Sequence, residues 1–244
     1  MPTNGFYGFS SIPFVEKYKP KYSVYFNGSN ALVATNLAIA QYSYTWSMWF
    51  HPLPTAVGTA AELISKRSYF ASATDDFPFA LNLNTTATSI TALEDSGTDY
   101  STDCTLVNTN LTPRVWHHVA VALQPSNTFY LWLDGIMMST TVGVTTPCAG
   151  SRNFTFGRCS YENGGGTNLS YFKGYMTDIR LYGRVLTHAE VLAIVAGYSN
   201  TTGLCHWWAC EEGTGTTLYN KYNSSYYNGT ITNGEWSQFV PDIK

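Results

Sequence analysis

Residues 116–141 read WHHVAVALQPSNTFYLWLDGIMMSTT, and this stretch indicates the fold class. Residues 115–123 and 129–133 each alternate apolar and other side chains, the pattern of a β-strand with one buried face. Gln124-Pro-Ser-Asn127 is a turn between them. Asp134-Gly135 then separates FYLWL from IMMSTTV and favours a type I′ hairpin, because that turn needs positive φ at both positions.

The same alternation recurs on both sides of this stretch. The further strands predicted from it lie at residues 22–26, 44–50, 153–158 and 174–182. Many short strands with a turn about every ten residues are typical of a sandwich. We therefore predict an all-β fold of two packed antiparallel sheets, with Trp46, Trp116 and Trp132 in its core.

One short helix interrupts the strands. Thr187 and Glu190 have the spacing of a capping box, in which each side chain bonds the backbone of the other residue. Leu186 and Val191 can form the flanking hydrophobic contact, and Gly197 is a typical stop signal. We predict that this helix lies on the sandwich and is structural.

Taken in order, several segments resemble the laminin-G-like jelly-roll family of the concanavalin A-like lectin/glucanase superfamily. They lie at residues 25–33, 44–52, 63–66, 116–121, 131–135, 156–158 and 172–182, followed by the capped helix at 186–197. The resemblance implies a jelly-roll sandwich and, for most members, a recognition role without catalysis.

Residues 204–219, with 227–231 and Glu235-Trp236, resemble the opening segment of this family but stand at the C-terminus. A circularly permuted order would let this segment complete the sandwich, because sandwich termini lie close in space. The alternative is the start of a truncated second repeat. We favour the permuted order, with an extended arm at 1–20 and one domain at 21–244.

Composition and sequons bear on the compartment. Charged residues make up 12% of the 244 residues and the net charge is −3, which gives no electrostatic reason to expect nucleic-acid or anionic-membrane binding. No apolar run reaches the roughly 18 residues of a membrane span, and residues 1–20 lack a secretory signal pattern. Eight N-x-Ser/Thr triplets, roughly twice the chance number, make an extracellular or virion surface the expected location.

These glycosylation triplets begin at Asn27, Asn84, Asn110, Asn153, Asn168, Asn200, Asn223 and Asn228. Turns rich in Asn, Ser and Thr generate the same triplets, so both readings stay open. The five cysteines leave at least one unpaired within the chain. Candidate disulfides join Cys205 to Cys210 or Cys104 to Cys148.

The resemblance also implies candidate ligands for one calcium ion, the only cofactor that we expect. Asp178 matches a position that often ligates through its carboxylate, and Glu212 is a further candidate. Asn30 and Asn220 stand where relatives often have Asp, so a charge is missing at each position. The alternative is that Asp178 pairs with Arg180 or another basic residue.

Aromatic side chains in loops are candidates for stacking against a sugar ring. We predict ligand-binding roles for Tyr69, Tyr100, Tyr161 and Tyr171, the last two flanking the glycine-rich stretch at 163–166.

Catalysis is not expected. Glycoside hydrolysis needs two facing carboxylates, and the Glu-x-Asp-x-Glu strand of related glucanases is absent from the sequence. Glu211 and Glu212 are adjacent and would point to opposite faces if extended. We interpret His117 and His118 as packing or hydrogen-bonding residues.

The sequence therefore predicts a non-catalytic recognition or structural module, displayed on a virion or cell-surface assembly. Its expected partners are glycans, subunits contacted through the N-terminal arm, or both. The alternatives are a structural decoration, minor capsid or fibre protein without a ligand and, with less support, a polysaccharide hydrolase.

Overall fold

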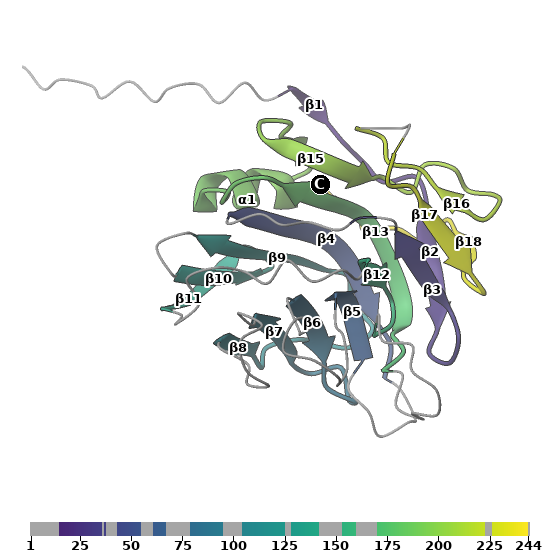
Figure 1. The fold of residues 1–244 in the computed structure, drawn as a ribbon, viewed down its shortest axis with the longest axis horizontal. Helices are drawn as coiled ribbons and strands as arrows, with labels where there is room; N and C mark the ends of the chain where they lie inside the picture. Colours follow the sequence, from purple (N-terminus) through teal and green to yellow (C-terminus); the bar gives the residue numbers. More distant parts are fainter. Residues whose placement is uncertain are drawn as a thin grey trace, which may run out of the picture.

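The computed structural model describes residues 15–35, 37, 43–54, 61–66, 79–94, 104–124, 128–141, 153–159, 170–222 and 226–243. Within these ranges the chain forms two eight-stranded sheets, a two-stranded ribbon and one short helix (Figure 1). Every pair of neighbouring strands is antiparallel. The predicted all-β, two-sheet sandwich with one helix is confirmed.

The first sheet runs in the order β11-β10-β9-β4-β13-β2-β18, and β15 also pairs with β13. Its strands are β2 (Ser23–Asn27), β4 (Tyr44–Pro52), β9 (His117–Gln124), β10 (Thr128–Leu133), β11 (Ile136–Thr141), β13 (Lys173–Tyr182), β15 (Leu204–Trp208) and β18 (Glu235–Ser237). The predicted hairpin joins β10 and β11, and its turn residues Asp134 and Gly135 have φ of 51° and 82°.

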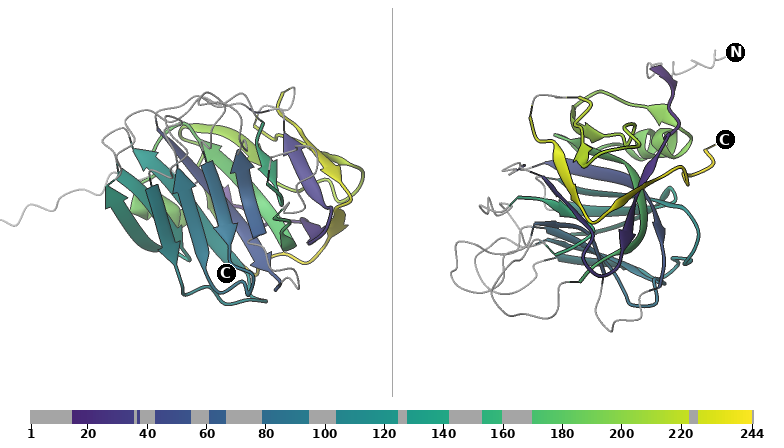
Figure 2. Two further views of the ribbon diagram at one scale, coloured as in Figure 1. Left: turned by 60° about the horizontal axis from the view of Figure 1, so that its bottom comes forward. Right: turned by 90° about the vertical axis from the view of Figure 1, so that its right-hand side faces the viewer.

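The second sheet runs in the order β16-β17-β3-β12-β5-β6-β7-β8. Figure 2 shows its neighbouring strands side by side in the left view. Its strands are β3 (Leu32–Thr35), β5 (Ala61–Lys66), β6 (Phe79–Leu83), β7 (Ile90–Glu94), β8 (Cys104–Asn108), β12 (Thr155–Phe156), β16 (Thr217–Leu218) and β17 (Gly229–Thr232).

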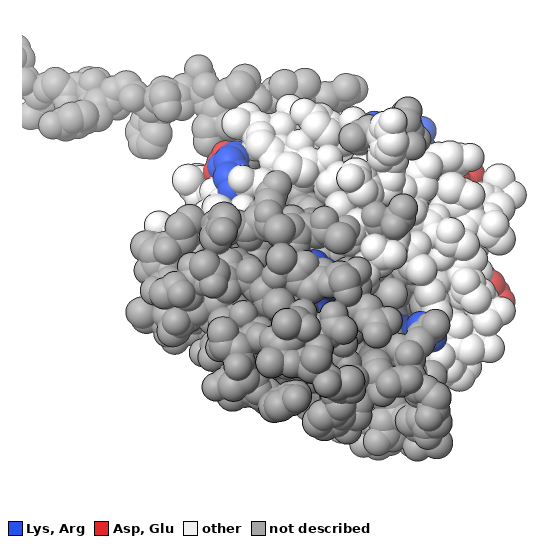
Figure 3. Space-filling model, in the orientation of Figure 1, with Lys and Arg blue, Asp and Glu red and all other residues white. Residues whose placement is uncertain are grey.

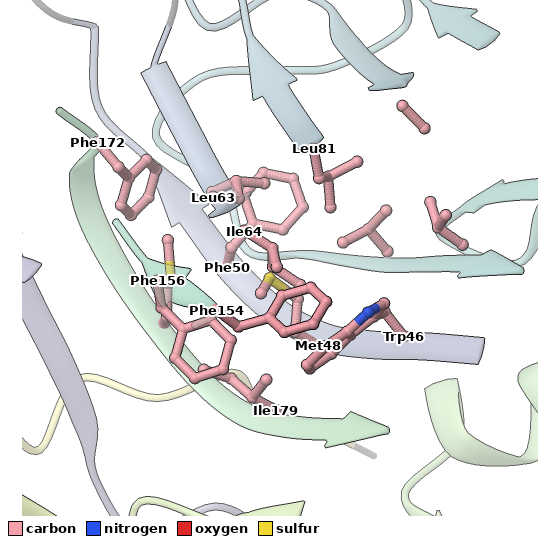
Figure 4. Close-up of a cluster of buried hydrophobic side chains, with 14 of the residues drawn as sticks. Trp46, Met48, Phe50, Leu63, Ile64, Leu81, Phe154, Phe156, Phe172 and Ile179 are labelled. Carbon is pink, nitrogen blue, oxygen red and sulfur yellow. The ribbon is translucent and has the colours of Figure 1, made fainter. Parts of the chain in front are cut away.

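The core lies between the two sheets. Trp46, Met48 and Phe50 alternate along β4 and point into this space, where they meet Leu81 and Phe156 of the second sheet (Figure 4). Each of these side chains is at most 2% exposed, and burying one such side chain stabilises the fold by about 1.5–3 kcal/mol. The alternation read from the sequence therefore identifies the inner face correctly.

One predicted core tryptophan lies elsewhere. Trp46 and Trp132 are buried as predicted, but Trp116 is only half-buried. Trp116 comes just before β9 and packs against His51, their ring centroids 5.6 Å apart. Phe50 pairs with His117 and faces the core, so the neighbouring residues His51 and Trp116 face outward.

Helix α1 (His188–Val195) covers one end of the outer face of the first sheet. The predicted capping box is present: the Thr187 hydroxyl accepts from the Glu190 amide, and a Glu190 carboxylate oxygen accepts from the Thr187 amide. Val191 and Ile194 are buried in a second apolar cluster with Trp132 of β10. The sequence therefore specifies both the start and the docking face of this helix.

The C-terminal segment adds strands to both sheets. β15 pairs with β13 and β18 pairs with β2 in the first sheet, while β17 pairs with β3 in the second. This segment therefore contributes strands to both sheets, and the permuted order stays a prediction.

The part of the N-terminal arm that the structure describes is anchored to the domain. β1 (Val15–Lys17) pairs with β14 (Tyr198–Ser199), which follows α1. Residues 1–14 lie outside the described residues, and the domain boundary at residue 20 stays a prediction.

In Figure 3 most of the described surface in view carries no charge.

Candidate functional site

The predicted calcium ligand Asp178 lies at an irregularity in β13. The first half of β13 pairs with β2 and the second half with β15. Asp178 stands at this change of neighbour, where the register with β4 shifts and its φ is 54°. Asp is among the few residues that adopt this left-handed conformation readily, so its presence suits the backbone as well as any role of its carboxylate.

Both carboxylate oxygens of Asp178 accept hydrogen bonds from neighbouring side chains. Arg180 donates to them through Nε at 2.8 Å and Nη2 at 2.9 Å, and the Trp207 indole donates at 2.7 Å. The Asp178 and Arg180 side chains are each 2% exposed. Burial alone would lower the pKa of Arg180, but the charge of Asp178 raises it above its ordinary value. The alternative reading, a pair with Arg180, is the observed one.

The Trp207 ring extends this cluster to other parts of the chain. Arg180 lies 4.7 Å and Lys221 4.6 Å from its centroid, both within the range of cation–π attraction. Tyr18 packs edge-on against Trp207 at 4.8 Å and donates its hydroxyl hydrogen to the Ala209 carbonyl. The cluster thus ties the N-terminal segment and β15 to β13.

Of the other predicted calcium ligands, Asn220 and Glu212 each have a hydrogen-bond partner, but Glu212 Oε2 is buried without one in the described residues. Asn220 is fully buried, and its carboxamide oxygen accepts from the Trp207 amide. Glu212 accepts from the Tyr219 amide at 3.0 Å.

Asn30 is exposed, and its oxygen accepts from the Asn27 amide nitrogen in the turn after β2. Among the described residues, no group of three His, Cys, Asp or Glu side chains is placed to hold a metal ion. The four residues do not fit a calcium ion as a set, and calcium binding elsewhere stays a prediction.

The predicted ligand residue Tyr171 lies beside polar side chains on the outer face of the second sheet. Tyr171 forms a parallel bridge with Glu62 of β5, and Glu62 pairs with Asn82 of β6 on its other side. The Arg158 guanidinium lies 5.9 Å from the centroid of the Tyr171 ring. We call Glu62, Asn82, Arg158 and Tyr171 the polar row.

Within the polar row, Tyr171 and Asn82 are half-buried, whereas Glu62 and Arg158 are buried. The Asn82 carboxamide oxygen is buried and has no hydrogen-bond partner in the described part of the chain. A buried polar atom without a partner costs about 1–3 kcal/mol. An incoming hydroxyl group could satisfy it.

Three members of the polar row were not predicted from the sequence. Glu62 and Asn82 each stand between two apolar residues, in AELISK and FALNL, and this placement is the signal that could have found them. Arg158 follows a glycine whose φ is 84°, and nothing local marks it. The other predicted ligand residues, Tyr69, Tyr100 and Tyr161, lie outside the described residues.

The predicted disulfide between Cys205 and Cys210 is wrong, because both residues are free thiols. Five residues apart on an extended segment, they face opposite sides of it. Cys205 is half-buried, and Cys210 is fully buried in the core, where burial raises its thiol pKa. Cys148 and the Cys104 side chain lie outside the described residues.

Six of the eight sequon asparagines are described. Asn84, Asn110 and Asn153 are exposed, and Asn27, Asn200 and Asn228 are half-buried. Asn168 and Asn223 lie outside the described residues, and glycosylation stays a prediction for all eight.

The sequence model of one family matches residues 26–192, which is more than half of the chain. The chain belongs to the concanavalin A-like lectin/glucanase superfamily. The matched region spans β3 to most of α1, and β15 to β18 follow it. A search of curated proteins by sequence gave no match.

Solved structures share the superfamily fold at low identity. A candidate carbohydrate-binding protein from Bacteroides ovatus ATCC 8483 matches with a TM-score of 0.68 and 14% identity, over 92% of this chain and 61% of that one. The sialidase CBM40 of Ruminococcus gnavus bound to α2,3-sialyllactose matches with 0.56 and 16%, over 71% and 97%. A heptameric SAP-like pentraxin from Limulus polyphemus matches with 0.55 and 13%, over 72% and 82%. These likenesses show the fold alone.

The superfamily name includes glucanases, so the acidic residues matter. Glu211 pairs with Lys221 at 2.7 Å, whereas Glu212 bonds the Tyr219 amide, so these adjacent carboxylates have separate partners. Asp75, Asp76 and Asp95 lie outside the described residues, and the absence of catalysis stays a prediction. Within the described residues, no helix is both long and apolar enough to cross a membrane.

His117 and His118 have the structural roles that were predicted. His117 Nδ1 lies 2.6 Å from Asp134 Oδ2, and the His118 amide donates to Asp134 Oδ1. Burial lowers the pKa of His117, but the bonds to Asp134 and the Thr112 carbonyl raise it by more than burial lowers it. The pKa of His117 therefore lies above its ordinary value of 6.5. Burial, with the nearby Arg180 charge, lowers the pKa of His118 to about 3.

We expect Asp178→Asn to destabilise the fold by about 3–5 kcal/mol, because it leaves Arg180 buried without its counter-charge. Asn also adopts left-handed φ, so the backbone can be kept. Urea unfolding measures the loss, and Glu211→Gln, at a partly exposed pair, should cost only about 0–1 kcal/mol. The loss of unfolding free energy should be the same in calcium and in EDTA. A loss seen only in calcium would indicate instead that Asp178 is a calcium ligand.

We expect stability to fall as the pH rises from 6.5 through the raised pKa of His117, because the protonated form of this residue is favoured by the fold. Stability should also fall as the pH drops from 6.5 toward 3, because buried His118 must stay neutral. Urea unfolding at a series of pH values tests both trends. Asp134→Asn should weaken the first trend and keep the second, and an unchanged first trend would contradict the assignment.

Proposed function

We propose that this chain is a non-catalytic recognition module that binds glycans and is displayed on a virion or cell surface. The observation that carries the proposal is the unpartnered Asn82 oxygen in the same row as the half-buried Tyr171 ring, with Glu62 between them. Membership of a superfamily named for lectins supports it.

The polar row has the groups that sugar recognition uses. A pyranose offers an apolar face that can stack on an aromatic ring, and hydroxyls that bond amides and carboxylates. The Arg158 guanidinium lies 5.9 Å from the centroid of the Tyr171 ring, and we propose that a sugar stacks on this half-buried ring. Asn82 can accept from one hydroxyl, while Glu62 and Arg158 hold the row in place.

The structural neighbours suggest which sugars to try first. The CBM40 neighbour is described with α2,3-sialyllactose, and another is described as a candidate carbohydrate-binding protein. We therefore propose sialylated glycans as first ligands for testing, with neutral glycans beside them.

The display setting rests on the sequence and on the N-terminal arm. The low share of charged residues and the eight sequons favour a setting outside the cell. β1 pairs with β14, so the domain holds the base of the arm and residues 1–14 precede this attachment. We propose that the arm contacts subunits of a larger assembly.

A glycan array with sialylated and neutral glycans, in calcium and in EDTA, tests the binding. We expect selective binding by the wild-type chain and a loss of affinity of about tenfold or more in Asn82→Ala and Tyr171→Ala. Tyr222→Ala, at an exposed tyrosine, is the matched control. No bound glycan would refute recognition, and release of reducing ends from any glycan would refute the non-catalytic assignment.

A further inference from the structure

The outer face of the first sheet carries a second row of side chains, opposite in character to the polar row. Tyr25 of β2 pairs with Tyr175 of β13, and Tyr175 pairs with His51 of β4. Trp116 lies next to His51. The successive ring centroids are 5.0, 5.8 and 5.6 Å apart. We call these four residues the aromatic row.

The aromatic row is covered by one ring of the C-terminal segment. Phe239 lies 4.9 Å from His51, 5.4 Å from Trp116 and 5.0 Å from Tyr175, measured between ring centroids. The Ser23 hydroxyl donates to the Phe239 carbonyl at 2.7 Å. Phe239 itself is 45% exposed, so its contact with the row contributes less than the burial of a whole side chain.

This cover leaves polar atoms beneath it without partners. Trp116 Nε1 and His51 Nδ1 are buried and have no hydrogen-bond partner in the described residues. The same holds for Trp49 Nε1 and His118 Nδ1, at the pair of facing positions next along β4 and β9. Each such atom costs about 1–3 kcal/mol. A phenyl ring such as that of Phe239 cannot satisfy any of them.

The chemistry of these atoms indicates what could satisfy them. Burial lowers the pKa of His51, which favours the neutral imidazole, in which one ring nitrogen donates and the other accepts. Trp116 Nε1 is a donor only. A hydroxyl group both accepts and donates, so hydroxyl groups can satisfy the Trp116 donor and His51 Nδ1 in either tautomer. An apolar peptide side chain offers no such atom.

We propose that the aromatic row is a second saccharide site, in which the ligand displaces Phe239 and stacks on the rings that Phe239 covered. A saccharide combines hydroxyls with an apolar ring face, which is what a row of aromatic rings with unpartnered nitrogen atoms requires. This inference shares its ligand class with the proposed function, but it uses a different sheet and different residues.

The test is an NMR titration of the full chain with 3′-sialyllactose and, separately, with cellohexaose, following the indole N–H signals. The Trp116 signal is assigned by its absence in Trp116→Phe, which keeps a ring but removes the donor. We expect the Trp116 signal to shift on titration. Affinity should fall about two- to tenfold in Trp116→Phe and rise in Phe239→Ala, while Tyr226→Ala at an exposed tyrosine should change nothing.

The two proposals fail separately in this experiment. If the Trp116 signal shifts in neither the wild type nor Phe239→Ala, the unpartnered atoms bind water only and the second site is refuted. Glycan binding that Asn82→Ala abolishes would still uphold the polar row. If the Trp116 signal shifts and Asn82→Ala changes no binding, the saccharide site at the aromatic row is supported and the one at the polar row is refuted.

Discussion

The bond between Asp178 and Arg180 holds the parts of this sandwich together. It forms at the point in β13 where the paired neighbour changes from β2 to β15. Both partners are buried, so neither tolerates loss of the other. Trp207 of β15 donates to the same carboxylate and packs against Tyr18. These contacts link β15 and the N-terminal segment to the Asp178–Arg180 pair. Within the C-terminal segment, this cluster ties β15 to β13.

This constraint separates structure from recognition. The carboxylate that family resemblance offers to calcium is already neutralised by Arg180, whereas unpartnered polar atoms lie on the outer faces of the two sheets. On the second sheet they accompany Tyr171 and Arg158, and on the first they lie beneath Phe239. Helix α1 covers only one end of the first sheet, so the aromatic row stays beyond its reach.

Local signals were enough for the fold. Alternation in β4, the Asp134-Gly135 turn and the Thr187 cap each act within a few residues, so the sequence predicts them. The sites depend on register between distant strands. Glu62 meets Asn82 only through the pairing of β5 with β6, and no local pattern encodes that. Trp116 was misplaced for another reason: alternation puts Val119 and Val121 in the core, so it already places Trp116 on the opposite face.

A crystal structure of the chain soaked with calcium and 3′-sialyllactose tests the central claim most directly, that this sandwich recognises glycans while Asp178 serves its stability. We expect saccharide density against Tyr171 and Asn82, with Arg180 still bonded to Asp178. Calcium bound to the Asp178 carboxylate, with Arg180 displaced and no saccharide on either sheet face, would contradict it.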